Sequence, residues 1–434
     1  MSHLDPSPDA PLAHRGTGRL HKGSRLHKGP RLHKGSRLAV AAIAAGSALL
    51  LGACSSDSDS GSGDSGSEES TASVDEQLMT DAVATYAEGV HASYEASLAS
   101  ARSMDAAVDA FVADPTEENL EAAKQAWLTA RDDYGPTEAF RFYGGPIDDE
   151  ETGTEGLINA WPLDEAYIDY VEGDATSGIV NDPEGYPTID AAVLVEANEA
   201  GGETNISTGW HAIEFLLWGQ DLSTDGPGQR PVEDYTTAEN ADRRAAYLTT
   251  ASDLLIEHLS ELVDAWAPDV EDNYRAEFEA LPPEEAMTMI ITGVGELSRG
   301  ELAGERMNVA YSERSQEDEH SCFSDNTTAD IVANAKGIQM VLDATYPGVS
   351  DGTSVIDVVA SVDPDLAEAL GSEVAASVAA VEAIPAPFDA HLVDGVSDDD
   401  PGRASVLAGI EALEAQTDTI VAAADAIGVT VNVT

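Results

Sequence analysis

The chain has 434 residues, 42% of them hydrophobic, which is long and apolar enough for two or three domains with real cores. Its 81 Asp and Glu residues outnumber its 21 Lys and Arg residues and give a formal net charge of −60. Such a surface repels nucleic acid and anionic lipid headgroups, so DNA or RNA binding by the body of the protein is excluded. The negative charge attracts cations and increases solubility.

An export signal is predicted at the N-terminus. A basic stretch with an imperfect six-residue repeat is followed by an apolar run over residues 38–53. The run is shorter than a membrane-spanning helix, which needs about 20 residues, and suits the core of a signal peptide. It ends in Leu51-Gly52-Ala53-Cys54, which resembles a lipobox. We therefore expect residues 1–54 to be a lipoprotein signal peptide with lipid on Cys54; an uncleaved anchor or an ordinary signal peptide is the alternative.

A flexible tether is predicted over residues 55–74. This segment consists almost entirely of Ser, Asp, Gly and Glu, and such a composition does not bury a core. It would hold the folded part of the chain away from the membrane.

Amphipathic helices are predicted from Asp75 onward. Apolar residues recur at steps of three and four from Leu78 to Ala101, as on one buried helix face. No convincing period-two alternation appears, so we predict an all-α fold of antiparallel helical bundles with long functional loops. Further helices are expected over residues 105–112, 116–134, 243–266, 283–299, 331–346, 364–383 and 403–427.

Long loops rich in Gly, Pro and Asp separate these helices, over residues 142–156, 173–187 and 220–235. Ordered loops of this length in a helical protein are often functional. The Gly226-Pro227-Gly228 cluster and a new helix near Ala238 predict a boundary between two bundle domains, at residues 75–237 and 238–434.

A candidate metal-ligand pair lies in the segment 204–221. A helix capped by Asn205, Ser207 or Thr208 would carry His211 and Glu214 three residues apart on one face. The rest of this helix is aromatic and aliphatic, so both polar side chains should be buried with partners. His-x-x-Glu alone fits a structural hydrogen-bonded pair as well as a pair of ligands. A zinc protease helix of the His-Glu-x-x-His type would add a second His, which is absent here.

A second polar group of residues follows Gly304-Glu305-Arg306-Met307. If the next segment is helical, Glu313, Glu317 and His320 share one face as three candidate ligands. A solvated helix surface is the plainer interpretation. Cys322 is expected to be a small buried residue rather than a nucleophile.

Five motifs in this order resemble the imelysin family, the group that includes the iron-regulated protein A type of exported lipoprotein, and the resemblance covers the body from about residue 75 onward. The segments that carry it are residues 209–222, 134–142 with 145–148, 158–164, 304–307 and 315–327.

The resemblance implies two helical bundles, a cell-envelope location, and a site between the bundles to which His211 and Glu214 contribute as metal ligands. Family members were classed as metallopeptidases. A further His often follows Asp-Asn-Thr in the family pattern, whereas this chain has Thr328 there.

With the family site in view, His91 is a further candidate ligand, because it shares a helix face with Glu88 and Glu95; a core histidine paired with one carboxylate is the alternative. We expect the residues lining the site to include Trp210, Arg141, Glu305, Arg306 and Cys322.

The leading hypothesis is a lipid-anchored protein at the outer face of the cell membrane or in the periplasm that binds a metal ion for uptake or sensing, beside an iron transporter component. Carboxylates with one or two imidazoles suit iron best, although zinc or calcium also fits part of the ligand set. The competing hypothesis is a metal-dependent peptidase in which Glu214 acts as base to a metal-bound water. A non-catalytic envelope scaffold is the third.

Overall fold

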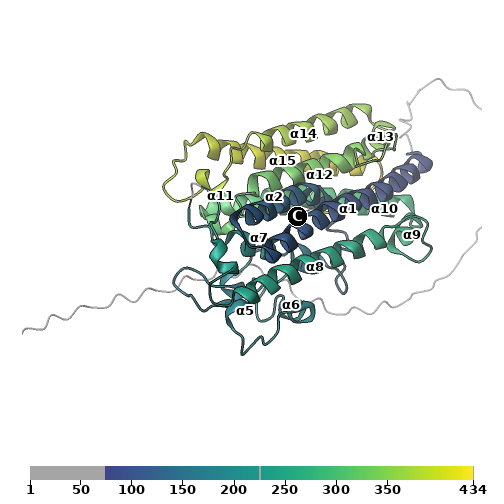
Figure 1. The fold of residues 1–434 in the computed structure, drawn as a ribbon. Coiled ribbons are helices and arrows are strands. Elements are labelled where there is room, and N and C mark those ends of the chain that lie inside the picture. The colour runs from purple at the N-terminus through teal and green to yellow at the C-terminus, as the bar shows by residue number, and fades with distance from the viewer. Residues whose placement is uncertain (1–73, 224–225, 434) are drawn as a thin grey trace, which may run out of the picture. The chain divides into compact units, whose positions relative to one another are not determined.

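The structure, a computed structural model, describes residues 74–223 and 226–433, and this part of the chain contains helices and no β-strand (Figure 1). The predicted all-α fold class is therefore confirmed. The predicted signal peptide with Cys54, and the tether up to residue 73, lie outside the described residues. The α-helices are α1 (Glu76–Ala113), α2 (Glu117–Tyr134), α3 (Glu155–Ile158), α4 (Glu165–Ile168), α5 (Gly178–Asn181), α6 (Ala191–Ala197), α7 (Gly209–Trp218), α8 (Ala241–Ala265), α9 (Tyr274–Glu279), α10 (Pro283–Glu296), α11 (Val309–Glu313), α12 (Thr327–Asp343), α13 (Val355–Ala360), α14 (Pro364–Glu382) and α15 (Pro401–Ala426).

Tighter and wider helical turns complete the elements. The 3₁₀ segments are η1 (Gly135–Phe140), η2 (Val232–Tyr235), η4 (Gln316–Asp318) and η5 (Asp389–His391). The segment η3 (Leu297–Asn308) is a π-helix that continues directly from α10 and leads into α11. Because π-helical turns are rare and concentrate at functional sites, η3 directs attention to the residues it carries.

The first helix shows how the sequence determines these elements. Asp75 caps α1 by accepting a hydrogen bond from the backbone N–H of Gln77. Its buried face repeats at helical spacing through Val83, Val90 and Leu98, and the helix ends where Pro115 follows Asp114. The structure thus joins two predicted helices, over 78–101 and 105–112, into one. Other predicted starts are confirmed, since α2 begins after Thr116 and α10 begins at a proline.

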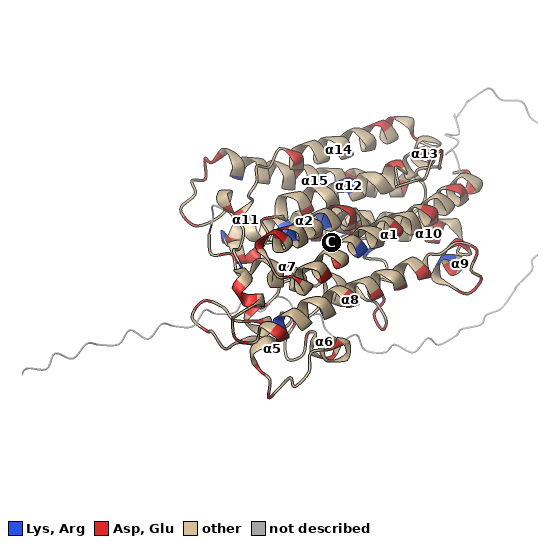
Figure 2. Ribbon diagram, in the orientation of Figure 1, with Lys and Arg blue, Asp and Glu red and all other residues tan. Residues whose placement is uncertain are grey.

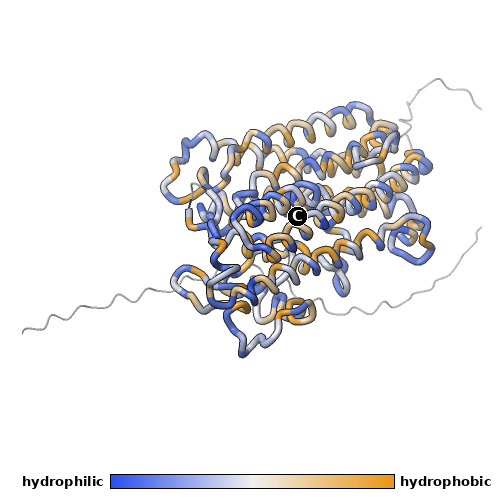
Figure 3. Tube along the Cα trace, viewed as in Figure 1, coloured by the Kyte–Doolittle hydropathy of each residue, from blue (hydrophilic) through white to orange (hydrophobic). Residues whose placement is uncertain are grey.

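The long helices lie side by side in layers (Figure 1). α1 packs against α2 and α8, and α12 packs against η1 and α14, which in turn packs against α15. Apolar residues of these helices form the buried core. Asp and Glu are spread over many elements (Figure 2), and hydrophobic and hydrophilic residues alternate along each helix (Figure 3). Among the described residues, no helix has the length and apolar character needed to cross a membrane.

The described residues fall within one compact unit. α8, which begins just after the predicted boundary at residues 237 and 238, packs against α1 and α7 from before it. The division into two bundles stays a prediction.

Candidate functional site

The helix α7 is the most deeply buried element of the site, since all ten of its residues are buried. A helix that is apolar nearly all round has to be covered on every side. Its N-terminus lies directly against α3: a Cβ on Gly209 would stand 2.4 Å from the carbonyl oxygen of Ile158, and the φ of Gly209 is +82°. Only glycine allows this close approach.

On α7, His211 and Glu214 contact each other, as their spacing predicts. The Nδ1 atom of His211 lies 3.0 Å from Oε2 of Glu214, and both side chains are fully buried. The other oxygen, Oε1, accepts hydrogen bonds from the backbone N–H (2.9 Å) and the hydroxyl (2.7 Å) of Ser324. Burial raises the pKa of Glu214 to about 8 and lowers that of His211 well below its usual range. At neutral pH the carboxyl therefore keeps its proton and donates to Nδ1, which leaves the proton of a neutral His211 on Nε2.

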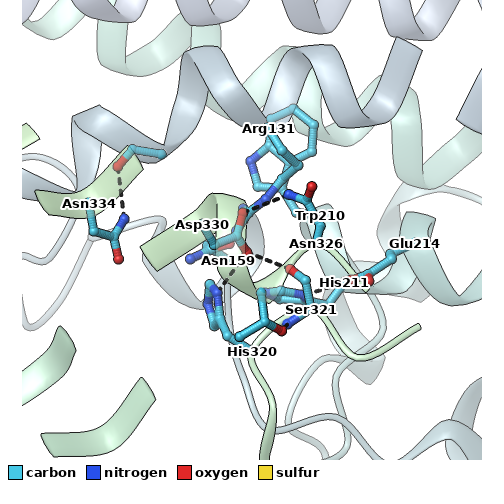
Figure 4. A network of polar contacts seen from close by, with 12 residues as sticks. Arg131, Asn159, Trp210, His211, Glu214, His320, Ser321, Asn326, Asp330 and Asn334 are labelled. Atoms are coloured by element: carbon cyan, nitrogen blue, oxygen red, sulfur yellow. Dashed lines mark hydrogen bonds and ion pairs between the residues drawn. The ribbon is translucent and has the colours of Figure 1, made fainter. Parts of the chain in front are cut away.

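A second histidine is held by Asp330 at the start of α12 (Figure 4). One oxygen of Asp330, Oδ2, accepts hydrogen bonds from Arg131 (2.8 Å), from Nδ1 of His320 (3.0 Å) and from the hydroxyl of Ser321 (2.5 Å). The other accepts from Asn326 at 3.0 Å. Burial alone would raise the pKa of Asp330, but the guanidinium of Arg131 and the hydrogen bond from His320 hold it well below its usual range.

The two imidazoles lie edge to face, with ring centroids 4.7 Å apart. The ring centroid of Trp161 lies 5.1 Å from that of His211, with the two planes tilted by 55°. Burial and the nearby Arg306 guanidinium lower the pKa of His320 to about 4, so this ring is neutral. Because Asp330 is anionic, His320 donates from Nδ1 and its Nε2 carries a lone pair. The Nε2 atoms of both histidines are buried without a hydrogen-bond partner among the described residues. His320, with an ionised carboxylate on Nδ1 and a lone pair on Nε2, has the arrangement by which proteins orient histidines toward metals. The Nε2 atom of His211 carries a proton in this state.

A network of paired charges surrounds the imidazoles. Arg306 on η3 donates to Glu138 (2.6 Å) and to Glu301 (2.8 Å), and Arg141 donates to the same oxygen of Glu138 at 2.8 Å. Burial would raise the pKa of Glu138, but these two guanidiniums lower it, so the carboxylate is ionised. Asn159 joins the two networks by accepting from Arg131 (2.6 Å) and donating to Glu138 (3.2 Å). The wide turns of η3 thus carry Glu301 and Arg306 into the site.

An acidic cavity of about 440 Å³ opens beside these groups. His320, Trp161, Arg141 and Arg306 line it together with six carboxylates, namely Glu155, Glu199, Glu203, Glu301, Glu305 and Asp318. We call this space the acidic cavity. Across residues 74–223 and 226–433, no group of three or more His, Cys, Asp or Glu side chains is arranged to hold a metal ion. The donor set therefore consists of two imidazoles beside an excess of dispersed carboxylates.

The structure brings together several residues that the sequence singled out. His211 contacts both Glu214 and His320. Trp210, on the same helix as His211, lies with its ring 5.6 Å from the Arg131 guanidinium. The predicted lining residues Arg141, Glu305 and Arg306 do line the acidic cavity. Cys322 is buried, and burial raises the pKa of its thiol.

The expected helical row of Glu313, Glu317 and His320 is wrong. α11 ends at Glu313, and Arg314 turns into the left-handed region with φ 55°, so the following residues leave the helix axis. Glu317 is exposed on η4 and is not among the residues lining the acidic cavity. His91 on α1 lies 3.6 Å from Glu95, in line with the alternative of a single carboxylate partner, and it does not line the cavity either.

Sequence reasoning missed Asp330, Arg131, Glu138 and Trp161. Asp330 lies on the buried face of α12 beside apolar residues such as Ile331 and Ala335, and a carboxylate at such a position indicates a buried partner. Trp161 belongs to the family-like segment 158–164, but nothing in the sequence predicted its contact with His211.

Residues 90–420 match the family model described as imelysin. Iron-regulated protein A from Synechococcus elongatus is 30% identical over 337 residues, which cover 76% of this chain and 80% of that protein.

Two solved structures share the fold. A crystal structure from Parabacteroides distasonis, named for an iron-regulated protein A precursor, has a TM-score of 0.63 and 20% identity, and covers 81% of this chain and 96% of that one. An imelysin-like protein from Psychrobacter arcticum has a TM-score of 0.57 and 14% identity, and covers 83% of this chain and 99% of that one.

Proposed function

The chain belongs to the imelysin family, and from that premise we propose that it binds iron, as Fe²⁺, at the imidazoles of His211 and His320 beside the acidic cavity. The observation that carries the proposal is the pair of buried Nε2 atoms without partners. Leaving a buried polar atom unpaired costs about 1–3 kcal/mol, and a metal ion satisfies the Nε2 lone pair of His320. Binding at His211 requires that the His211–Glu214 pair release one proton, so that Nδ1 donates to an ionised Glu214 and Nε2 carries a lone pair.

Ligand chemistry favours a ferrous ion over harder cations. Neutral imidazole suits Fe²⁺ and Zn²⁺, whereas Ca²⁺ takes oxygen ligands. Two nitrogens leave further positions on the metal for water or for carboxylates of the acidic cavity. The relative from Synechococcus elongatus is linked to iron by its name, which supports iron over zinc.

The two carboxyls position the histidines rather than bind the metal. Asp330 holds Nδ1 of His320, and its oxygens already accept four hydrogen bonds. Glu214 uses both of its oxygens on His211 and Ser324. With no oxygen facing the acidic cavity, Glu214 does not meet the geometry of a general base for a metal-bound water, which argues against the peptidase hypothesis.

Equilibrium dialysis against Fe²⁺ without oxygen tests the proposal. We expect the wild-type protein to bind iron and the double variant His211→Ala, His320→Ala to lose binding by about a hundredfold or more, while His91→Ala binds like the wild type. Equal affinity in the double variant and the wild type would refute the proposal. A peptide-cleavage assay on the same samples should give no activity; cleavage that disappears in the double variant would favour the peptidase.

We further propose that the protein acts on the outer side of the cell membrane or in the periplasm, where it serves iron uptake or sensing beside a transporter component. The lipobox-like residues before Cys54 and the polar segment behind them support this location. Mass spectrometry of the protein from its native membrane should find Cys54 as a lipidated N-terminus. Recovery of the basic repeat, or of an unmodified Cys54, would contradict the anchor.

A further inference from the structure

The acidic cavity is far larger than a bare metal ion requires. Its volume is about 440 Å³. Six water molecules occupy about 180 Å³ in the liquid, at about 30 Å³ each, so a cation with its full first hydration shell fits inside. The volume therefore raises the question of whether the ion enters with or without its water.

Negative charge in the cavity is concentrated on its exposed side. Glu199 and Glu203 follow α6, and Glu305 lies on η3; all three are exposed, and no hydrogen bond or ion pair engages their side chains within the described part of the chain. Deeper in, the charges are paired: Glu155 lies 3.1 Å from Arg141, and Glu301 lies 2.8 Å from Arg306. Asp318 also lines the cavity, is half-buried, and has no ion pair among the described residues. The unpaired charge therefore belongs to Asp318 and to the three exposed glutamates, and we call these three glutamates the rim carboxylates.

At the inner end of the cavity stands one imidazole. His320 is the histidine that lines the cavity, it is 3% exposed, and its Nε2 has no hydrogen-bond partner among the described residues. Asp330 fixes the ring through Nδ1. Between the rim and this nitrogen, the described side chains include no set of three donors placed to bind a cation directly.

We propose that the acidic cavity captures a divalent cation together with its hydration shell, through hydrogen bonds from the metal-bound waters to Glu199, Glu203 and Glu305, and that His320 then replaces one water. Dispersed carboxylates that are not placed to act as common ligands can still accept hydrogen bonds from coordinated water. Divalent cations that lose water reluctantly are commonly held in this way. In the second step one water leaves, the lone pair of Nε2 takes its position, and the charge on the metal is unchanged.

The capture step stands on the cavity alone, whereas the exchange step rests on the proposed function. The same charge arrangement predicts which forms of a metal enter. An anionic complex, such as a metal carboxylate chelate, is repelled by the rim carboxylates. An aquated ion is attracted by them.

Hexaamminecobalt(III) separates capture from ligation. Its six ammonia ligands exchange too slowly to be displaced during a titration, and they donate hydrogen bonds as metal-bound water does. We expect calorimetric titration of the purified chain to detect this ion at one site above the diffuse binding that any strongly acidic protein shows. The variant with Glu199→Gln, Glu203→Gln and Glu305→Gln should bind it about tenfold more weakly, because three charges at water-separated distance are removed.

The matched control removes the same charge elsewhere. Glu257, Glu368 and Glu411 are exposed on α8, α14 and α15, so the variant Glu257→Gln, Glu368→Gln, Glu411→Gln changes the net charge equally without touching the cavity. This variant should keep the site. Equal weakening in both triple variants would show diffuse attraction only and would overturn the capture step.

His320→Ala distinguishes this inference from the proposed function. The variant should bind hexaamminecobalt(III) as the wild type does and should lose affinity for Fe²⁺. If Fe²⁺ affinity is unchanged in His320→Ala while the rim variant still weakens the cobalt complex, the proposed ligand is wrong and the capture step stands. If the cobalt complex binds equally to the rim variant and the wild type, the capture step is wrong, whatever Fe²⁺ does.

Discussion

Two buried ionic networks in this protein look alike and differ in one respect. In the first, Asp169 accepts hydrogen bonds from Arg244 at 2.5 and 2.9 Å and from Arg230 at 2.8 Å, and Arg230 also contacts Asp234. In the second, Asp330 accepts from Arg131 and His320. Each centres on a carboxylate that is at most 2% exposed.

The difference lies in the atoms left without a partner. Among the described residues, the atom without a partner in the network of Asp169 is Nε of Arg230. This atom is an N–H donor on a cation, and such a group does not bind a metal. The network of Asp330 borders two neutral imidazoles whose Nε2 atoms are unpaired and one of which faces an acidic cavity. Buried ion pairs are by themselves weak evidence of function. The unpaired nitrogens next to a cavity are what distinguish the second network.

The largest expected effect is on stability and should not distinguish the networks. Asp169→Ala and Asp330→Ala each leave buried guanidiniums without their carboxylate, so each should lower the free energy of unfolding by about 3–5 kcal/mol. Urea denaturation followed by circular dichroism measures this. A loss below about 1 kcal/mol in either variant would contradict the buried charge pairing.

Iron binding should separate the same two positions. Asp330→Asn keeps the shape of the side chain and some of its hydrogen bonds but weakens the hold on His320, so the folded variant should bind Fe²⁺ about ten- to a hundredfold more weakly. Asp169→Asn should bind iron normally when folded. Dialysis at a temperature where both variants are native provides the comparison, and equal iron affinity would remove the distinction between the two networks.

Packing under the site should matter for stability only. Trp210 is fully buried against Trp127 and Tyr134, and Leu217 is fully buried on the same helix. Trp210→Ala and Leu217→Ala should each destabilise the fold by about 2–5 kcal/mol through the cavity that they leave. Denaturant melts of both variants measure the effect, with the exposed Leu222→Ala as control, which should be nearly neutral.

The pH dependence should differ because the pKa of Glu214 beside the candidate site is raised, whereas, despite burial, that of Asp169 is lowered by its two guanidiniums. The pKa of Glu214 is raised to about 8 in the folded state, against about 4.3 when unfolded. The folded protein therefore holds an extra proton between these values, and this contribution to stability is lost as the pH rises toward and through 8. Glu214→Gln mimics the protonated form, so its melting temperature relative to wild type should increase from pH 6 to pH 9. A constant difference across this range would show that Glu214 is ionised in the fold.

Added salt should have the smallest effect on the melting temperature, and the effect should be the same for variants in both networks. Added salt screens repulsion among exposed carboxylates over about 8 Å near 0.15 M, but buried pairs are screened much less. The melting temperatures of wild type, Asp169→Asn and Asp330→Asn should rise by the same few degrees in sodium chloride. A falling melting temperature would contradict self-repulsion of the acidic surface.

Local patterns predicted the helices well because each long helix repeats its apolar residues along one face, as from Met79 to Phe111 on α1. The spacing of His211 and Glu214 predicted their contact for the same reason. The position of His320 depends on the left-handed turn at Arg314, which ends the helix, and on the hydrogen bond to Asp330 ten residues later. No periodic pattern in the sequence predicts such a contact. The π-helix η3 was not predicted either, although the step of five residues from Leu297 to Leu302 departs from the steps of three and four in α10.

The central claim is that iron binds through the unpaired imidazole nitrogens. The most direct measurement is a crystal soaked with Fe²⁺ without oxygen, with anomalous diffraction recorded at the iron absorption edge. We predict a peak about 2.0–2.2 Å from Nε2 of His320, the usual length of a metal–imidazole bond, with His211 adjacent. A peak held only by carboxylates away from both imidazoles, or no peak in crystals soaked at saturating iron, would contradict the account.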